Sequence, residues 1–159
     1  MKQTKEVILG IDPGTTRIGY GVIEKNGPDL KHLEYGCLKV NTVNRLLSTK
    51  EELFKLIKKY KPNRAVVEKL FFNKNVKTAM AVSEARGVIM LCLQEKGIHT
   101  HELTPLEVKQ GISGYGQAGK EQVQRMVKLI LKLEDIPKPD DAADALAIAI
   151  CGSTLPIDF

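Results

Sequence analysis

Two acidic residues each end a short apolar run, a place where a carboxylate calls for an explanation. Asp12 follows the run 7–11 and precedes Pro13-Gly14, so it either starts a turn or points into a ligand site. Glu68 follows the run 65–67, and because glutamate is disfavoured within strands, it is either a solvated strand end or a ligand. Since α/β sheets bind ligands at the carboxyl ends of their strands, both carboxylates are candidates for one site.

Asp141 and Asp144 lie three residues apart in the alanine-rich segment 141–150, which is predicted to form the last helix. This spacing puts both side chains on one helix face, with their Cβ atoms about 5–6 Å apart. Asp140 and Asp141 have another explanation, because Asp140 is predicted to cap the helix and Asp141 suits its positive end. Asp144 lies deeper, among small alanines that allow close packing, where an unpaired carboxylate would be costly.

Four carboxylates brought together would repel one another, and a divalent cation would remove that repulsion. Oxygen ligands suit a hard ion, so Mg²⁺ is the natural candidate, and Mn²⁺ could substitute for it. Two such ions about 3.5–4 Å apart could activate a water molecule and stabilise the leaving oxygen during attack on a phosphodiester. The sequence therefore predicts a metal-dependent nuclease whose catalytic and metal-binding residues are Asp12, Glu68, Asp141 and Asp144.

The softer metal ligands offer no competing site. His99 and His101 alternate on one face of a predicted strand, and such a pair is more often solvated than bound to a metal. The three cysteines are odd in number, far apart and surrounded by apolar residues: Cys37, Cys92 and Cys151. This pattern predicts core thiols in a reducing compartment rather than disulfides or a zinc site.

The elements that must position the carboxylates follow from apolar runs and turn signals. Runs at 7–11, 19–23 and 33–38, with a turn signal at 26–28, predict a three-stranded antiparallel meander. Two further strands are predicted at 65–67 and 98–103.

Helical spacing of apolar residues predicts helices over 43–60, 76–96 and 120–131, besides the one over 141–150. A short helix is expected to begin at Pro105, capped by Thr104, and the glycine-rich segment 111–119 is expected to be a mobile loop. The resulting order βββαβαβααα predicts an α/β fold of three layers, a five-stranded mixed sheet with helices on both faces.

Length and charge set the broad class. With 159 residues, the chain is expected to form a single domain, 1–159, around one core. Its 24 lysines and arginines exceed its 19 acidic residues, and the net charge of +5 suits a polyanionic partner without requiring one. The polar N-terminus and the lack of a long apolar run predict a cytoplasmic protein that does not enter a membrane.

Four segments occur together in an order and spacing that resemble one known family. They are Gly-Ile-Asp-Pro-Gly-Thr-Thr-Arg-Ile-Gly-Tyr-Gly at 10–21, Val-Val-Glu-Lys-Leu-Phe-Phe at 66–72, Ser-Glu-Ala-Arg-Gly at 83–87, and Asp-Ala-Ala-Asp-Ala-Leu-Ala-Ile-Ala-Ile at 141–150. Together they resemble the RuvC family of bacterial Holliday-junction resolvases, over residues 5–151. The four predicted carboxylates match the acidic quartet of that family.

The resemblance implies a ribonuclease-H-like fold and a homodimer. It also implies Mg²⁺-dependent, paired and symmetric nicks in four-way DNA junctions during recombination and repair, with RuvA and RuvB as partners. The long helix predicted over 76–96 fits this picture, because it has more apolar surface than one sheet face needs and would suit a second copy of the chain.

The resemblance further implies residues that contact DNA. Phe71 matches an aromatic residue that stacks near the crossover, an interaction of ~1–3 kcal/mol per base, while Phe72 is the alternative for this role. Lys109 and Lys120 match lysines that contact DNA, and they flank the glycine-rich segment. The implied DNA-binding set is therefore Phe71, Lys109, Lys120, Lys74 and Lys77.

Three other functions remain open from the sequence. The segment 10–16 also resembles the first phosphate loop of actin-like ATPases and sugar kinases, although those enzymes need two lobes. A second alternative is a DNA-binding module without catalysis, and a third is another ribonuclease-H-like nuclease that acts on RNA–DNA hybrids or transposon ends.

Overall fold

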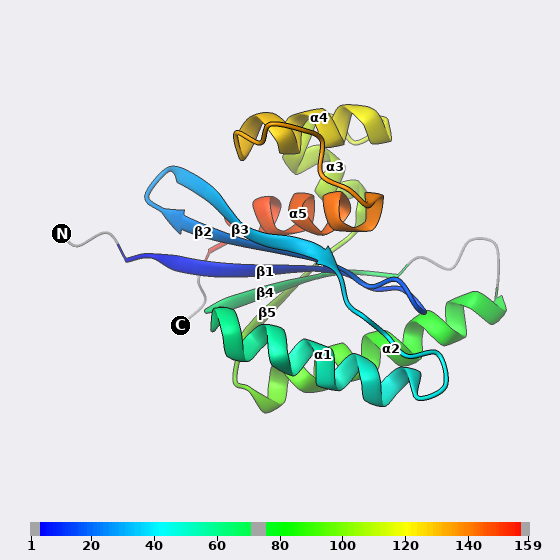
Figure 1. The fold of residues 1–159 in the computed structure, drawn as a ribbon. Helices are drawn as coiled ribbons and strands as arrows, with labels where there is room; N and C mark the ends of the chain where they lie inside the picture. The colour runs from blue at the N-terminus through cyan, green and yellow to red at the C-terminus, as the bar shows by residue number, and fades with distance from the viewer. Residues whose placement is uncertain (1–3, 71–75, 157–159) are drawn as a thin grey trace.

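The structure, a computed structural model that describes residues 4–70 and 76–156, is built on a five-stranded mixed sheet (Figure 1). The strand order is β3-β2-β1-β4-β5. The central strand β1 (Glu6–Asp12) pairs antiparallel with β2 (Gly19–Asn26), which pairs antiparallel with β3 (Asp29–Cys37). On its other side, β1 pairs parallel with β4 (Arg64–Glu68), and β4 pairs parallel with β5 (His99–Leu103).

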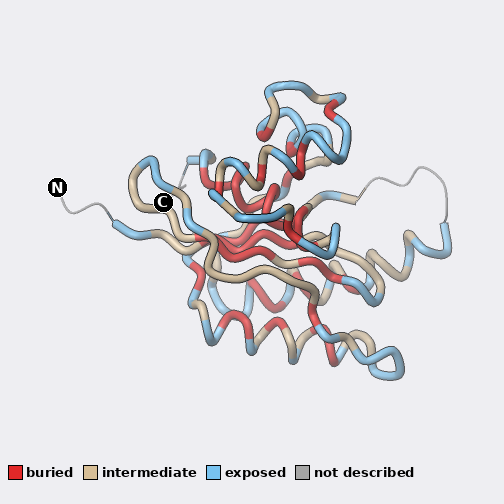
Figure 2. Tube along the Cα trace, turned by 45° about the horizontal axis from the view of Figure 1, so that its top comes forward, coloured by how far each residue is buried: buried red, intermediate tan, exposed pale blue. Residues whose placement is uncertain are grey.

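Helices cover both faces of this sheet. Figure 1 shows α1 (Arg45–Tyr60) and α2 (Val76–Glu95) on one face and α5 (Asp140–Gly152) on the other. Outside α5 lie α3 (Pro105–Ser113) and α4 (Lys120–Ile130). Buried residues concentrate in the sheet and on the inner sides of the helices, and they form one apolar core on each face (Figure 2). The three-layer fold and the predicted order of elements are confirmed.

The segment 111–119 differs from the prediction. Helix α3 continues to Ser113 and ends where Gly114 adopts a left-handed conformation, with φ of 72°. Gly111 lies inside this helix, and a glycine suits this position because α3 packs closely on α5. A Cβ at Gly111 would lie 2.8 Å from Sγ of Cys151. Ala118 is buried in the core. The predicted loop is therefore wrong for 111–113, where glycine serves close packing rather than a turn.

The start of α3 follows the prediction. The side chain of Thr104 accepts a hydrogen bond from the Glu107 amide at 3.1 Å, and the Glu107 carboxylate accepts one from the Thr104 amide at 2.7 Å. This reciprocal cap, with Pro105 as the first helical residue, fixes where α3 begins and hence where Lys109 lies.

Helix α5 approaches the sheet unusually closely because glycines face it. A Cβ at Gly10 would lie 2.1 Å from the carbonyl oxygen of Ala145, and one at Gly19 would lie 2.0 Å from that of Asp141. No side chain fits between these backbones, so α5 rests directly on β1 and β2. This contact brings the acidic first turns of α5 to the carboxyl end of β1.

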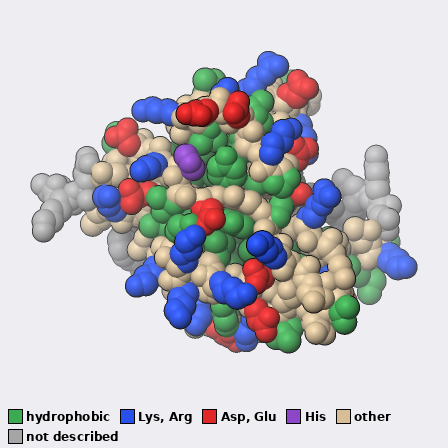
Figure 3. Space-filling model, viewed as in Figure 1, with side chains coloured by type: hydrophobic (Ala, Val, Ile, Leu, Met, Phe, Trp, Pro, Cys, Tyr) green, Lys and Arg blue, Asp and Glu red, His purple; other side chains and the backbone are tan. Residues whose placement is uncertain are grey.

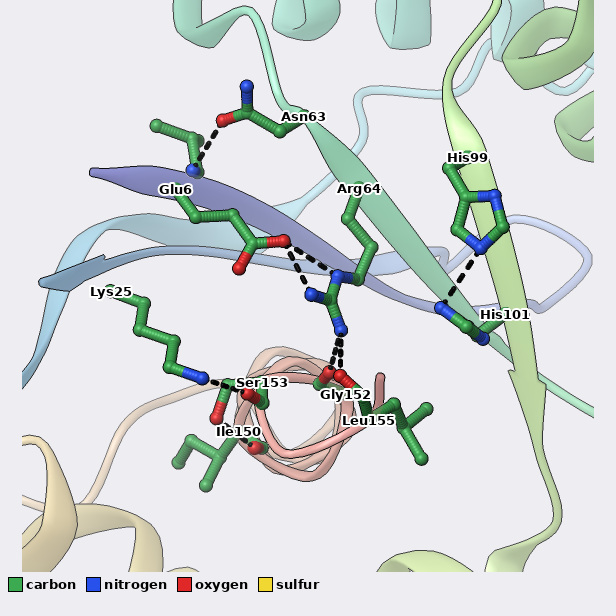
Figure 4. Close-up of polar contacts among 11 residues, drawn as sticks. Glu6, Lys25, Asn63, Arg64, His99, His101, Ile150, Gly152, Ser153 and Leu155 are labelled. Atoms are coloured by element: carbon green, nitrogen blue, oxygen red, sulfur yellow. Dashed lines mark hydrogen bonds and ion pairs between the residues drawn. The ribbon is translucent and has the colours of Figure 1, made fainter. Parts of the chain in front are cut away.

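The other end of α5 is fastened by a buried arginine. Arg64 donates hydrogen bonds to the carbonyl oxygens of Gly152 at 2.7 Å and Leu155 at 2.8 Å, and it pairs with the Glu6 carboxylate at 2.7 Å (Figure 4). Arg64 begins β4 and Glu6 begins β1, so this end of the helix is tied to both central strands. The tie satisfies carbonyl groups that a helix end leaves without partners.

His99 is exposed and His101 is half-buried, and two of the three cysteines lie in the core. Nε2 of His99 lies 3.1 Å from Nε2 of His101, on the edge strand β5 (Figure 4). The thiols of Cys37, Cys92 and Cys151 are free. Cys92 and Cys151 lie in the core as predicted, but Cys37, at the end of the edge strand β3, is only half-buried, so the prediction of a core thiol is wrong for it. Among the helices of the described residues, none is long and apolar enough to span a lipid bilayer.

Candidate active site

Three carboxylates converge where β1 ends and α5 begins. Asp12 is the last residue of β1, and Asp141 and Asp144 lie on the first turns of α5. One carboxylate oxygen from each of these residues lies within 4.8 Å of the others. Among the described residues, Asp12, Asp141 and Asp144 form the one group of three or more acidic, histidine or cysteine side chains that lie close enough together to hold a metal ion.

Glu68 joins this group from the neighbouring strand. Because β1 and β4 run parallel, with Ile11 paired to Val67, their carboxyl ends meet at one edge of the sheet. The Glu68 carboxyl hydrogen-bonds to that of Asp12. The structure thus brings together all four carboxylates that the sequence singles out.

Burial and mutual repulsion change the acidity of the group. Burial, followed by the charges of Glu68 and Asp144, raises the pKa of Asp12 to about 8. Burial also raises the pKa of Glu68, although its hydrogen bond with Asp12 acts in the opposite direction, and burial raises the pKa of Asp144. Near neutral pH, Asp12 therefore keeps a proton and shares it with Glu68 when no cation is bound.

This donor set fits a hard divalent cation. All four side chains offer carboxylate oxygens, three of them already close enough to share an ion. A cation can take the place of the proton that Asp12 retains, since positive charge at this point removes the repulsion that raises its pKa.

Two lysines lie beside the carboxylates. A cavity of about 240 Å³ is lined by Lys109 of α3 and Lys120 of α4 together with Glu68 and Asp144. The charge of Lys109 lowers the pKa of Glu68, and that of Lys120 lowers the pKa of Asp144, in part offsetting the effect of burial. Elements distant in sequence thus supply the positive charge that the acidic motifs lack, at a place where a phosphate group could contact both lysines.

The role predicted for Asp140 is wrong. The N-cap of α5 is Pro139, which makes no side-chain cap, and Asp140 is already the first helical residue. Its carboxylate instead accepts hydrogen bonds from Nζ of Lys120 and Nε2 of Gln124, both at 3.1 Å. The bond from Lys120 lowers the pKa of Asp140. Asp140 therefore holds Lys120 at the edge of the site.

Of the other predicted DNA-binding residues, the structure describes only Lys77. Lys77 is exposed in the first turn of α2 and is not among the described residues that line the cavity. Phe71 and Lys74, and the alternative Phe72, lie outside the described residues.

Sequence reasoning missed one residue next to the carboxylates. Arg86 of α2 directs its Nε at the carbonyl oxygen of Glu68, 3.4 Å away. It belongs to the segment 83–87 that carries part of the family resemblance, but that segment showed no chemistry of its own. The available signal was an arginine between apolar residues of a helix, where a charge needs a partner.

The family model described as crossover junction endodeoxyribonuclease RuvC matches residues 8–152, a range that includes all four carboxylates. The chain belongs to the RuvC family. RuvC of Petrotoga mobilis is 54% identical over 149 residues, which cover 91% of each chain. RuvC of Halothermothrix orenii is 52% identical over 149 residues, covering 91% of this chain and 90% of the relative. Both relatives carry the name crossover junction endodeoxyribonuclease RuvC, and the predicted family is confirmed.

Solved structures of the RuvC family have the same fold. RuvC of Thermus thermophilus in complex with a Holliday junction substrate matches with a TM-score of 0.86 and 32% identity, covering 93% of each chain. The yeast mitochondrial Holliday junction resolvase Ydc2 matches with a TM-score of 0.66 at 16% identity, which is a similarity of fold alone. Membership of the RuvC family decides against an ATP-binding lobe, the alternative suggested by the segment 10–16.

Proposed function

We propose that this protein resolves Holliday junctions, making paired symmetric nicks in four-way DNA during recombination and repair. The observation that carries the proposal is the carboxylate quartet, which a RuvC-family chain places at one sheet edge beside two lysines. The Thermus thermophilus relative in complex with a Holliday junction supports this substrate. It also favours DNA junctions over the RNA–DNA hybrids and transposon ends that the sequence left open.

Asp12, Glu68, Asp141 and Asp144 would hold two Mg²⁺ ions, for which Mn²⁺ could substitute. When bound, the ions would supply an activated water molecule and positive charge for the leaving oxygen of the phosphodiester. The protein's own contribution is to hold the four carboxylates within reach of one phosphate. The partial burial of Asp12, Glu68 and Asp144 would strengthen their interaction with a cation.

Lys109 and Lys120 would bind the DNA backbone over the carboxylates, with Asp140 orienting Lys120. Figure 3 shows lysine and arginine side chains spread over the whole visible face and mixed with acidic ones. On this face, charge alone therefore marks no DNA surface, and the two lysines are proposed because they line the cavity. Phe71, Lys74 and Lys77 remain proposals that rest on the family resemblance.

We also propose a homodimer formed through α2. Among the apolar residues of this helix, Ile89 and Leu93 are buried in the protomer, whereas Val76, Met80 and Leu91 are 78%, 63% and 51% exposed. An exposed apolar stripe on a long helix suits a second copy, and two-fold symmetry would present two sites to two DNA strands. A single nuclease domain over 1–159, a cytoplasmic location, and partnership with RuvA and RuvB stay predictions.

The test is incubation of the purified protein with an end-labelled four-way junction, with Mg²⁺ or with EDTA. Linear duplex of the same sequence is the control substrate. The proposal predicts paired nicks at symmetric positions of the junction only in Mg²⁺, and little cutting of the duplex. Equal cutting of junction and duplex, or cutting in EDTA, would contradict it.

A further inference from the structure

Arg86 connects α2 to the edge of the sheet that carries the carboxylates. Its Nε donates to the carbonyl oxygen of Glu68 at 3.4 Å, and its guanidinium pairs with the Glu102 carboxylate of β5. The Arg86 side chain is 21% exposed. One side chain thus reaches β4 and β5 from a helix on the face opposite to α5.

Glu68 stands at a point where the sheet offers it little support. The pairing of β4 with β1 ends at Val67, so Glu68 is paired only with Leu103 of β5. On that side, the amide of Lys69 donates to the carbonyl oxygen of Leu103 at 2.7 Å. The carbonyl oxygen of Glu68 itself is the group that Arg86 holds.

We propose that Arg86 is a positioning residue for the metal site. It holds the main chain of Glu68 and so sets where the Glu68 carboxylate lies relative to Asp12. This inference rests on the proposed function, because it takes Glu68 as a metal ligand. A guanidinium can serve two partners at once through its rigid fork of donors, whereas the single ammonium of lysine reaches one of them.

Glu102 completes the arrangement. Its carboxylate holds the guanidinium from β5, so the position of Arg86 is set by the sheet and not by α2 alone. Residues that support metal ligands from behind typically change metal affinity by about 10–100-fold when they are removed. Arg86 is therefore expected to affect metal binding more than it affects folding.

The surroundings of Arg86 allow it to be replaced without collapse of the fold. A cavity of about 340 Å³ lies beside it, lined in part by Ser83, Gly87 and Glu102. Water can enter this space and solvate Glu102, whose side chain is 37% exposed. Replacement of Arg86 thus leaves no buried charge without a partner, and the variant Arg86→Met is expected to fold.

Arg45 provides a matched control. It also donates to a backbone carbonyl oxygen, that of Ala81 at 3.0 Å, and pairs with a carboxylate, that of Glu84 at 2.7 Å. Its side chain is 18% exposed, close to the value for Arg86. Both of its partners lie on α2, away from the four carboxylates, so Arg45→Met removes the same kinds of contact without touching the site.

The experiment measures Mn²⁺ binding without DNA, through the electron paramagnetic resonance signal of free Mn²⁺, at a temperature where every variant is folded. Arg86→Met is expected to weaken Mn²⁺ affinity by about tenfold or more, and Arg45→Met to leave it unchanged. The Mg²⁺ concentration needed for half-maximal junction cleavage should shift in the same way. Equal Mn²⁺ affinity in Arg86→Met and Arg45→Met would overturn the inference.

Two further variants separate the possible failures. Arg86→Lys keeps the charge but cannot hold both partners. Weakened Mn²⁺ binding in this variant supports the inference even if Arg86→Met does not fold. Mn²⁺ affinity equal to that of the wild type overturns it. Asp144→Asn should lose Mn²⁺ affinity whatever Arg86 does. If wild-type protein binds no Mn²⁺, or Asp144→Asn binds it as the wild type does, the site assignment itself fails.

Discussion

At the scale of single residues, the raised pKa of Asp12 explains why the site favours binding of a cation. An exposed aspartate is ionised at neutral pH, but burial and three acidic neighbours raise the pKa of Asp12 to about 8. Its ionised form is therefore unfavourable in the metal-free protein and becomes favourable once a cation is bound.

This shift predicts a specific dependence of stability on pH. A carboxyl whose pKa is higher in the folded state stabilises the fold at low pH, and that contribution is lost as pH rises from the unfolded value of 3.8 through about 8. In EDTA, the free energy of unfolding of the wild type should fall between about pH 6 and pH 9, more than that of Asp12→Asn. Urea unfolding at both pH values measures this.

Mg²⁺ is the control for the pH experiment. Saturating Mg²⁺ should reduce the fall in stability, because the ion neutralises the repulsion among the carboxylates. A wild type and an Asp12→Asn variant with the same pH dependence in EDTA would show that Asp12 is not perturbed.

The carboxylates could be predicted from sequence because their residue type conflicts with their local surroundings. Glu68 ends a strand, and Asp144 lies among alanines in a helix interior. The contacts of Asp140 and Arg86 could not be predicted in the same way. The contacts of Asp140 depend on which residue begins α5, and those of Arg86 depend on a hydrogen bond from α2 to the end of β4. Tertiary packing sets both.

At the scale of elements, the site depends on the contact between α5 and the central strands. Glycines in β1 and β2 let the helix backbone rest on the sheet, and Arg64 fastens the far end of the helix. The acidic residues of α5 meet Asp12 because no side chain separates the two backbones.

The variant Gly10→Ala tests this contact. Its Cβ would lie 2.1 Å from the carbonyl oxygen of Ala145 and 2.7 Å from the amide nitrogen of Ala149, and backbone atoms cannot move aside as a flexible side chain can. The free energy of unfolding should fall by about 3 kcal/mol, measured by urea unfolding.

Gly87→Ala is the matched control, because a Cβ at Gly87 meets nothing within 4 Å. Replacing this helical glycine should raise the free energy of unfolding by about 0.5–1 kcal/mol. If Gly10→Ala were as stable as the wild type, the close approach of α5 to β1 would be wrong.

The order of elements was predictable because each has a local signal, such as an apolar run, a turn signal or the reciprocal cap at Thr104. The boundary of α3 was not. Glycines at 111 and 114 look alike in the sequence, but Gly111 lies in the helix against Cys151, whereas Gly114 ends it with a positive φ. Only the packing of α3 on α5 separates these two roles.

At the scale of the whole molecule, symmetric cutting requires two sites in one assembly. The exposed apolar residues of α2 are the proposed contact between protomers. The double variant Met80→Glu, Leu91→Glu should be monomeric in sedimentation experiments, because burying two carboxylates at an apolar interface is costly. It should nick one strand of a junction without the paired second nick.

Leu129→Glu is the control for the dimer, because Leu129 is 68% exposed on α4, away from α2. This variant should remain dimeric and make paired nicks. A double variant that stays dimeric would place the interface elsewhere.

The central claim is that the carboxylates cut DNA while other side chains, the lysines beside them, bind it. The most direct measurement compares wild type, Asp144→Asn and the exposed control Asp135→Asn for both binding and cleavage of one four-way junction in Mg²⁺. Asp144→Asn should lose about 100-fold or more in cleavage rate and keep junction affinity within a few-fold, because the lysines remain. Asp135→Asn should match the wild type in both. Cleavage by Asp144→Asn at a near-native rate would contradict the assignment of the site.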